Sequence, residues 1–520
     1  MSRLPVVFAL LFAASYTQPL HYYSNQNQYF LHGLARAGYG NLNEDWLANT
    51  TDPTPVFSAG IALGYRLGSW TFQAVQFAAI VVYFLSVWKL IGAVRLLPKT
   101  VAGKLLFAGL LTLSHAAILR VASDRVLGAD YPWFFQCGLA NQYLLGAGLQ
   151  PSVAGVLLVT ALAAYASGRP VLACGLAAAV NVVHATYLLP SAMLVAGMLV
   201  GVLRVEGAKK GFLAGGLALL IALPVAFYQM YTFGPTGDYS NFEHARWIIA
   251  YERIPHHTRP ARWFDAAAGF QMVWMLLGFA ALIRTRLQLP LVVALGLATL
   301  GTTAVVIYPS TTLTLLFPWR VTSVLIPVAT AVLIAQGTLW LESRPNLSAA
   351  TGLVVLFVCL MGAGAVYYFR LGYREPAAEN AVLDYIRQHK QKGDVYLTPA
   401  RFAKPTSARG VYSLTFAPPT DPTATVYFEL ARFRLATGAA QYIDFKSIPY
   451  RDDEVLEWHH RISQCVTWFG TTDWDAAGTI DEIAREGITH VVAPVALKLK
   501  SKRLAVLADA GAYRVYRILP

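Results

Sequence analysis

Residues 188–230, LLPSAMLVAGMLVGVLRVEGAKKGFLAGGLALLIALPVAFYQM, contain two apolar runs joined by a loop that carries Arg204, Lys209 and Lys210. The same alternation continues in both directions along the chain, and basic residues collect on every second loop. The other loops of this basic set hold Arg3, then Lys89, Arg95, Lys99 and Lys104, then Arg169, then Arg284 and Arg286, then Arg344. Positive charge beside membrane spans is retained on the cytoplasmic side, so we expect these loops inside and the intervening loops outside.

The composition indicates a polytopic α-helical membrane protein. Hydrophobic residues make up 56% of the chain, the mean hydropathy is +0.47 and charged residues reach only 13%, whereas they form about a quarter of a soluble domain. The net charge is +13, but acidic and basic residues nearly balance after residue 371. The excess therefore belongs to the membrane part and its loops, and we expect no nucleic-acid partner.

A helix needs about 20 apolar residues to cross the hydrocarbon layer. Eleven ranges qualify as candidate spans: 4–20, 70–94, 101–120, 151–168, 171–187, 188–204, 211–230, 266–283, 287–308, 318–340 and 347–369. With Arg3 inside, an odd number of crossings places the C-terminal end outside, and every basic loop then falls inside. Two alternatives stay open. The first run has features of a cleaved signal peptide, and the stretch 171–204, with Pro190, is either a hairpin or one bent segment.

The polar chemistry lies in the expected outer loops and beyond the last span. Loops 18–70, 121–152 and 231–265 are long and rich in aromatic residues, which predicts a folded outer face rather than disorder. We therefore divide the chain into a membrane module, 1–370, and an extracytoplasmic domain, 371–520. Apolar periodicity in the second part predicts helices over 377–391, 452–465 and 479–485 and strands over 394–398, 489–493 and 513–518. This alternation is typical of a small α/β domain, and no Gly-rich phosphate loop precedes its helices.

Several short stretches carry a resemblance. They are Asn43-Glu44-Asp45-Trp46 in the first outer loop, Gln150-Pro151-Ser152, the stretch NVVHATYLL at 181–189, and Phe317-Pro318-Trp319-Arg320 at the mouth of a span. With the predicted topology, they resemble an uncharacterised bacterial branch of the GT-C superfamily of membrane glycosyltransferases. The resemblance implies transfer of a sugar from a polyprenyl-phosphate donor to an envelope glycan, lipid or protein acceptor, at the outer side of the bacterial inner membrane.

The resemblance also implies that the first outer loop supplies a catalytic base. The matching residue is Asp45, with Glu44 beside it. A carboxylate there could accept the proton of an acceptor hydroxyl as the phosphate leaves. The alternative is that Asp45 caps the short helix that begins at Trp46, because Asp is favoured at that position.

Cations at the outer surface would stabilise the departing lipid phosphate. Arg320 is the first candidate, because the loop re-enters the membrane there. Arg246 and Arg253 come next, and Arg125 is able to face Asp124 or Asp130. For each arginine the alternative is an interfacial anchor that reaches the lipid headgroups.

Further polar residues are candidates for the same cavity. Asn181 and His184 lie three apart on one expected helix, which would place them on one face, towards either a cavity or a neighbouring helix. His32 is a third candidate, in the first outer loop. We expect His256 and His257 to be surface histidines rather than metal ligands, and Cys137 and Cys465 to be free thiols rather than a disulfide. No cofactor is required, and a divalent metal remains open.

Two other classes of function remain as alternatives. A polysaccharide or lipid transporter or flippase would need charged residues or broken helices near the bilayer midplane, whereas the expected spans are almost free of charge. A non-catalytic envelope scaffold would need far fewer spans. The pattern therefore favours chemistry at the outer surface, with a lipid-linked donor, membrane lipids and a glycan or lipid acceptor as partners.

Overall fold

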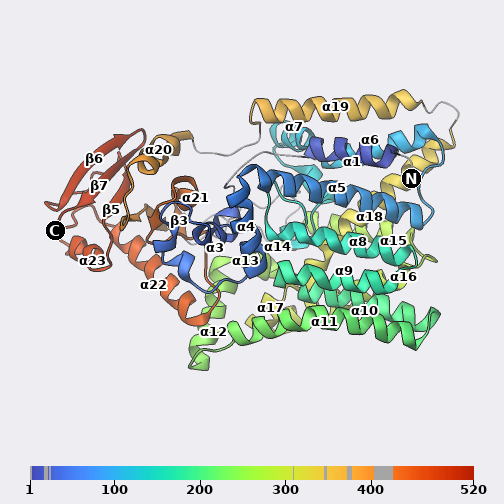
Figure 1. Cartoon of the computed structure of the whole chain (residues 1–520), viewed down its shortest axis with the longest axis horizontal. Coiled ribbons are helices and arrows are strands. Elements are labelled where there is room, and N and C mark those ends of the chain that lie inside the picture. The colour runs from blue at the N-terminus through green and yellow to red at the C-terminus, as the bar shows by residue number, and fades with distance from the viewer. Residues whose placement is uncertain are drawn as a thin grey trace.

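The computed structural model describes residues 3–16, 22, 25–308, 310–344, 348–371, 377–402 and 426–520. The chain forms a bundle of long helices with a smaller α/β domain at one end (Figure 1). The predicted fold class, a polytopic helical membrane protein followed by an α/β domain, is confirmed.

The bundle has helices at all eleven ranges expected from hydropathy. They are α1 Leu4–Tyr16, α5 Trp70–Ala93, α6 Val101–His115 with α7 Ala117–Leu127, α8 Val156–Ala166, α9 Pro170–Val183, α10 Leu188–Val205, α11 Ala208–Thr232, α15 Ala266–Ala280, α16 Gln288–Ile307, α18 Thr322–Glu342 and α19 Ala349–Tyr368. Six are long and apolar enough to cross a membrane, and the pair α6–α7, bent by 53°, makes seven if counted as one span. At the other four ranges the apolar helices are shorter, so the number of crossings stays a prediction.

The stretch 171–204 is a hairpin. Helix α9 ends at Val183, the backbone of His184 is extended, and a short turn, η6 Ala185–Tyr187, leads into α10. Helices α9 and α10 pack against each other, so the chain reverses at His184. Pro190 lies in the first turn of α10, where a missing N–H costs little.

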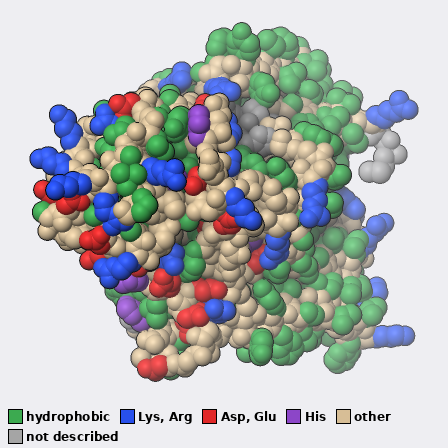
Figure 2. All heavy atoms as spheres, turned by 60° about the vertical axis from the view of Figure 1, so that its left-hand side comes forward, with side chains coloured by type: hydrophobic (Ala, Val, Ile, Leu, Met, Phe, Trp, Pro, Cys, Tyr) green, Lys and Arg blue, Asp and Glu red, His purple; other side chains and the backbone are tan. Residues whose placement is uncertain are grey.

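The basic loops meet at the end of the bundle away from the α/β domain. Lys99 and Thr100 donate backbone hydrogen bonds to Glu342, at the end of α18. Arg286 pairs with Glu206, which joins two further basic loops. Figure 2 shows charged side chains over the α/β domain, a largely hydrophobic surface over the helices, and Lys and Arg again at the far end.

The intervening loops are folded, as expected, and form the end of the bundle next to the α/β domain. The first contains α2 Gln26–Tyr29, α3 Leu31–Arg36, η1 Leu42–Glu44, η2 Leu47–Asn49 and α4 Pro55–Leu67. The second contains η3 Tyr131–Phe135, η4 Leu139–Asn141 and η5 Pro151–Gly155, which leads into α8. The third and fourth contain α12 Tyr239–Trp247, η7 Ile248–Arg253, α13 Pro255–Thr258, α14 Pro260–Trp263, α17 Thr311–Leu315 and η8 Pro318–Val321.

The α/β domain is built on a five-stranded mixed sheet of order β4-β1-β5-β7-β6. Strand β1 is parallel to β4 and β5, with Tyr396 opposite His490, while β7 is antiparallel to β5 and β6, with Val491 opposite Tyr516. A separate antiparallel pair, β2–β3, stands beside it. The elements are η9 Ala377–Glu379, α20 Asn380–His389, β1 Val395–Leu397, β2 Ala400–Phe402, β3 Val426–Phe428, α21 Phe433–Thr437, β4 Ala440–Gln441, α22 Asp452–Trp468, α23 Thr479–Arg485, β5 His490–Pro494, β6 Leu504–Ala510 and β7 Tyr513–Ile518.

The grouping of the basic loops generates a topology prediction. We expect the basic end to face the cytoplasm and the α/β domain to lie outside. Alkaline phosphatase fused after Pro520 should therefore be active, and green fluorescent protein fused there should be dark. A fusion truncated after Ser343, at the basic end, should give the opposite signals. Fluorescence from the fusion after Pro520 would contradict the orientation.

Candidate functional site

Asp45, the expected base, is buried between the first outer loop and the α/β domain, with an exposed fraction of 1%. Its Oδ1 accepts the backbone N–H groups of Leu47 at 2.9 Å and Ala48 at 3.3 Å. Its Oδ2 accepts Nε of Arg434 at 2.6 Å and the backbone N–H of Gln441 at 2.8 Å. Both oxygens are thus engaged by protein donors, and the geometry favours the capping interpretation over the base.

Arg434 is the centre of this buried contact. Its guanidinium pairs with Asp45 and also with Asp444, and Nη2 donates to the carbonyl of Gln441 at 2.9 Å. Burial opposes its charge, but the two carboxylates raise the pKa of Arg434 above its usual value. Burial raises the pKa of Asp444, and Arg434 offsets only part of that effect. We call Asp45, Arg434 and Asp444 the ion triad.

Glu44 makes a second contact across the same interface. Its Oε2 accepts the backbone N–H of Gly393 at 2.8 Å, at the turn before β1. Both acidic residues of the expected catalytic pair therefore hold the α/β domain against the first outer loop.

Arg320, the first candidate for a phosphate contact, lies in η8, just before α18, and is 9% exposed. Phe317 has a left-handed backbone with φ 49° and turns the chain into η8, which carries Arg320. Nη1 donates to Oε1 of Gln142 at 2.7 Å, and the guanidinium lies 5.0 Å from the ring centroid of Tyr187. Its Nε has no hydrogen-bond partner, and within the described ranges Arg320 forms no ion pair.

Other basic side chains from separate loops lie around Arg320. His184 is buried, and its ring meets Tyr187 edge-on at 5.8 Å. His257 uses Nδ1 to donate to the carbonyl of Ala140 at 2.7 Å. We define the basic cluster as a set of side chains whose charges act on one another in this region: His184, Arg253, His256, His257, Arg320 and Lys446.

Burial and the positive charges of the basic cluster lower the pKa values of two of its histidines, His256 and His257. Arg253 is buried, and it donates to the carbonyl of Lys446 and lies 5.3 Å from the ring centroid of Phe445. Burial, with Arg253 and Lys446 nearby, lowers the pKa of His256 to about 3. Burial and the neighbouring cations also lower the pKa of His257 well below its usual value. The expectation that these histidines lie at the surface is wrong, because they are half-buried inside this cluster.

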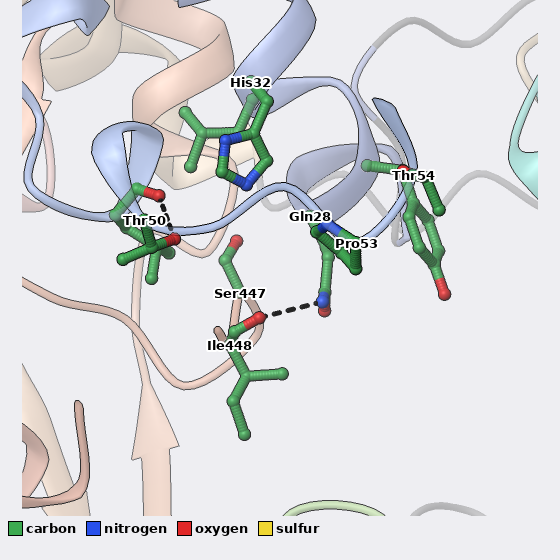
Figure 3. Close-up of a pocket in the computed structure, with 10 residues that line it drawn as sticks. Gln28, His32, Thr50, Pro53, Thr54, Ser447 and Ile448 are labelled. Atoms are coloured by element: carbon green, nitrogen blue, oxygen red, sulfur yellow. Dashed lines mark hydrogen bonds between the residues drawn. The ribbon is translucent and has the colours of Figure 1, made fainter. Parts of the chain in front are cut away.

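A small pocket lies beside the basic cluster, under the α/β domain. We call it the roof pocket. Figure 3 shows His32 pointing into the space between Thr50, Gln28 and Ser447. The pocket has room for little more than one water-sized group. Tyr29 also lines it, and the ring of Tyr29 meets that of His184 edge-on at 5.6 Å.

The remaining candidates lie elsewhere. His184 ends α9 with an extended backbone, so Asn181 and His184 do not share a regular helix face, and the expectation that they do is wrong. Asn181 donates to Oγ of Ser191 at 3.4 Å, which is a helix-packing contact. Asp124 and Arg125 are exposed on α7, Asp130 pairs with Arg120, and Arg246 lies over the ring of Phe242 at 4.8 Å.

The part of the chain that the structure describes contains no group of three His, Cys, Asp or Glu side chains able to hold a metal ion. The rings of His256 and His257 lie 4.1 Å apart without a third ligand among the described residues. Cys137 and Cys465 are buried free thiols in separate parts of the molecule.

Comparison with known proteins finds one family model and several solved structures. A family model described as a domain of unknown function (DUF6798) matches residues 417–465, and its described part carries Arg434, Asp444 and Ser447. No curated protein matches the chain. Among solved structures, the chain is similar to "Crystal Structure of ArnT from Cupriavidus metallidurans bound to Undecaprenyl phosphate", with 13% identity, 98% of this chain and 96% of that chain covered, and a TM-score of 0.39. The likeness is distant, so the function has to be inferred from the site itself.

The ion triad generates a stability prediction. Arg434→Met leaves Asp45 and Asp444 buried without a cation, which should lower the free energy of unfolding by roughly 3–5 kcal/mol. Asp45→Asn should also destabilise the protein, because it removes one partner of the buried cation. Thermal unfolding of the solubilised chain measures both changes.

The control is Arg451→Met. Arg451 pairs with Asp453 at the surface, and exposed pairs contribute about 0–1 kcal/mol. If Asp45→Asn unfolds like the unmodified chain, Asp45 does not hold the domain, and its role as a base regains support.

Proposed function

We propose that this protein is a GT-C-type membrane glycosyltransferase that moves a sugar from a polyprenyl-phosphate donor to an envelope glycan, lipid or protein acceptor. The observation that carries the proposal is Arg320. It is a buried cation at the mouth of a helix, without an ion-pair partner in the described ranges.

The energetics of Arg320 favour an anionic ligand. A buried charge costs several kcal/mol unless it is paired, and Gln142 and the face of Tyr187 compensate only part of that cost. A guanidinium is suited to phosphate because it offers several N–H donors in one plane. A lipid phosphate is the anion that reaches the mouth of a membrane helix most readily.

The rest of the basic cluster fits the same ligand. His256 and His257 are held neutral by burial and by neighbouring positive charge. Positive charge is therefore already in excess at the site, and what it lacks is a negative charge. A phosphate beside Arg320 would supply it. As the sugar–phosphate bond breaks, negative charge grows on the phosphate, and fixed cations stabilise that charge. The cluster provides this charge without a cofactor.

The distribution of polar groups supports surface chemistry over transport. The basic cluster and the roof pocket lie at one end of the bundle, between the outer loops and the α/β domain. A transporter would place its binding groups near the middle of the spans. An envelope scaffold would have no use for a buried cation at a membrane mouth. We place the protein in the bacterial inner membrane, with the reaction on the side of the α/β domain.

Changing Arg320 tests the proposal. Arg320→Met keeps the length of the side chain but removes its charge, and it should weaken the binding of undecaprenyl phosphate roughly 10- to 100-fold, as expected for loss of a charged hydrogen bond. The affinity of Arg320→Lys should lie between those of Arg320→Met and the unmodified chain, because an ammonium keeps the charge but cannot contact phosphate through a planar pair of donors. Tryptophan fluorescence in nanodiscs measures binding, since Trp319 lies next to Arg320 and 5.0 Å from the ring of Trp263.

Arg246→Met is the matched control. Arg246 lies over Phe242 and should bind the lipid phosphate as the unmodified chain does. Equal binding by Arg320→Met and the unmodified chain would remove Arg320 from the donor site.

A further inference from the structure

We infer that the roof pocket receives the reacting hydroxyl of the acceptor and that Nε2 of His32 takes its proton. The inference rests on the proposed function, since it assigns the acceptor side of the same reaction. Its basis is the geometry of five residues around the pocket: Gln28, Tyr29, His32, Thr50 and Ser447.

The orientation of His32 leaves one ring nitrogen for a ligand. Nδ1 lies 3.1 Å from the carbonyl of Ala48, and a carbonyl only accepts, so Nδ1 carries the proton. Nε2 is then the basic nitrogen, and no described residue bonds to it. Figure 3 shows the ring with its free edge directed into the pocket. Burial lowers the pKa of His32, which keeps the imidazole neutral and able to accept a proton at pH 7.

Two hydroxyl oxygens of the pocket, those of Thr50 and Ser447, are also available as acceptors. The hydroxyl of Thr50 donates to the carbonyl of Leu47 at 2.7 Å, and that of Ser447 donates to the carbonyl of Asn27 at 3.0 Å. Each hydroxyl proton is therefore used, and the oxygen lone pairs remain. The described lining holds no carboxylate, Lys or Arg. An anion would find no cation here and a cation would find no counter-charge, whereas a neutral hydroxyl would find several acceptors.

The size of the pocket limits what enters it. Room for little more than one water-sized group admits a single hydroxyl at the end of an acceptor rather than a whole sugar ring. The bulk of the acceptor must then remain outside the pocket. This fits a long or membrane-bound acceptor that presents one hydroxyl.

The roof pocket is adjacent to the proposed donor phosphate. Gln28 donates to the carbonyl of Ile448 at 3.1 Å and to the hydroxyl of Tyr450 at 3.0 Å, which joins the pocket to the α/β domain. Burial raises the pKa of Tyr29, and the charges of Arg320 and Arg253 act on the same phenol. Tyr29 thus lines the pocket and also lies within the field of the basic cluster. The inference requires the anomeric carbon of a sugar held on a phosphate at Arg320 to lie beside Tyr29, between the two.

The reaction then balances as a single displacement. The acceptor oxygen forms a bond to the anomeric carbon, and its proton moves to Nε2 of His32. The bond between the anomeric carbon and the phosphate oxygen breaks, and the electron pair leaves with the polyprenyl phosphate. The imidazolium of His32 later returns its proton to water.

Asp45 enters this scheme as a positioning residue. Its Oδ1 accepts the N–H of Ala48, and the carbonyl of Ala48 fixes the ring of His32. The carboxylate that the family resemblance implies as the base therefore holds the backbone that orients a different base. Its loss should reduce transfer through the orientation of His32 and through folding.

The first arm of the test needs no donor. Slow deuterium exchange at Cε1 of an imidazole is a modification that needs only access of water, and peptide mass spectrometry of the full chain in nanodiscs follows it separately at His32 and at the exposed His389. Glycerol serves as a small polyol that can insert one of its hydroxyls into the pocket. We expect glycerol to slow modification of His32 at least threefold and to leave His389 unchanged. Equal rates with and without glycerol would overturn the inference and indicate a pocket that holds only structural water.

The second arm uses His32→Gln with His389→Gln as its matched control. Transfer is followed from a panel of undecaprenyl-phosphate-linked sugars to an envelope extract. Loss of a general base lowers kcat by roughly 10²- to 10⁴-fold, so we expect a loss in that range for His32→Gln, with undecaprenyl phosphate bound within twofold of the unmodified affinity. Transfer at the unmodified rate would overturn the inference. Failure of the unmodified chain to bind undecaprenyl phosphate would instead count against the proposed function, and glycerol protection would then show only whether the pocket takes a hydroxyl beside His32.

Discussion

The structure depends on one buried contact, in which Arg434 lies between Asp45 and Asp444. Arg434 and Asp444 belong to the α/β domain and Asp45 to the first outer loop, and loss of Arg434 leaves two carboxylates in the interior without a cation. The contact therefore fixes the α/β domain in one position over the outer loops. Asp444 extends the effect, because its Oδ1 accepts the N–H of Ser447 at 2.7 Å. The residue that forms one wall of the roof pocket is thus held directly by the ion triad.

The charges of this end of the molecule are divided by role. The acidic side chains are occupied: Asp45 and Asp444 hold Arg434, and Asp52 pairs with Arg36 at 2.9 Å. The basic side chains of the cluster include Arg320, which forms no ion pair in the described part of the chain. An anion-binding site between two modules needs two things. Its carboxylates must be used to join the outer loops to the α/β domain, and a cationic side chain such as Arg320 must stay unpaired at the membrane mouth.

The sequence predicted what depends on local pattern and missed what depends on distant partners. Hydropathy located all the long helices, and the sequence makes Arg320 a candidate because it follows Pro318 and Trp319 at the start of an apolar run. The role of Asp45 could not be predicted, since its partner Arg434 lies 389 residues away and no spacing rule links them. Capping by Asp45 depends on local pattern alone, and the sequence does predict it as the alternative to a base. The prediction that Asn181 and His184 share a helix face failed because the chain turns at His184. An apolar run without a Gly or Pro at that point does not reveal such a turn.

The choice between a carboxylate and an imidazole as base follows from the field of the basic cluster. A free carboxylate within reach of Arg320 and Arg253 would pair with them, and it would then compete with the phosphate that the site has to hold. A neutral imidazole such as that of His32 does not compete, because it carries no charge until it takes a proton. Burial lowers the pKa of His32, and the charges of Asp52 and Asp45 offset only part of that effect, which keeps the imidazole in its basic form. A site that binds phosphate through cations is therefore better matched by His32 than by an unpaired Asp45, and the carboxylate is left free to hold the fold.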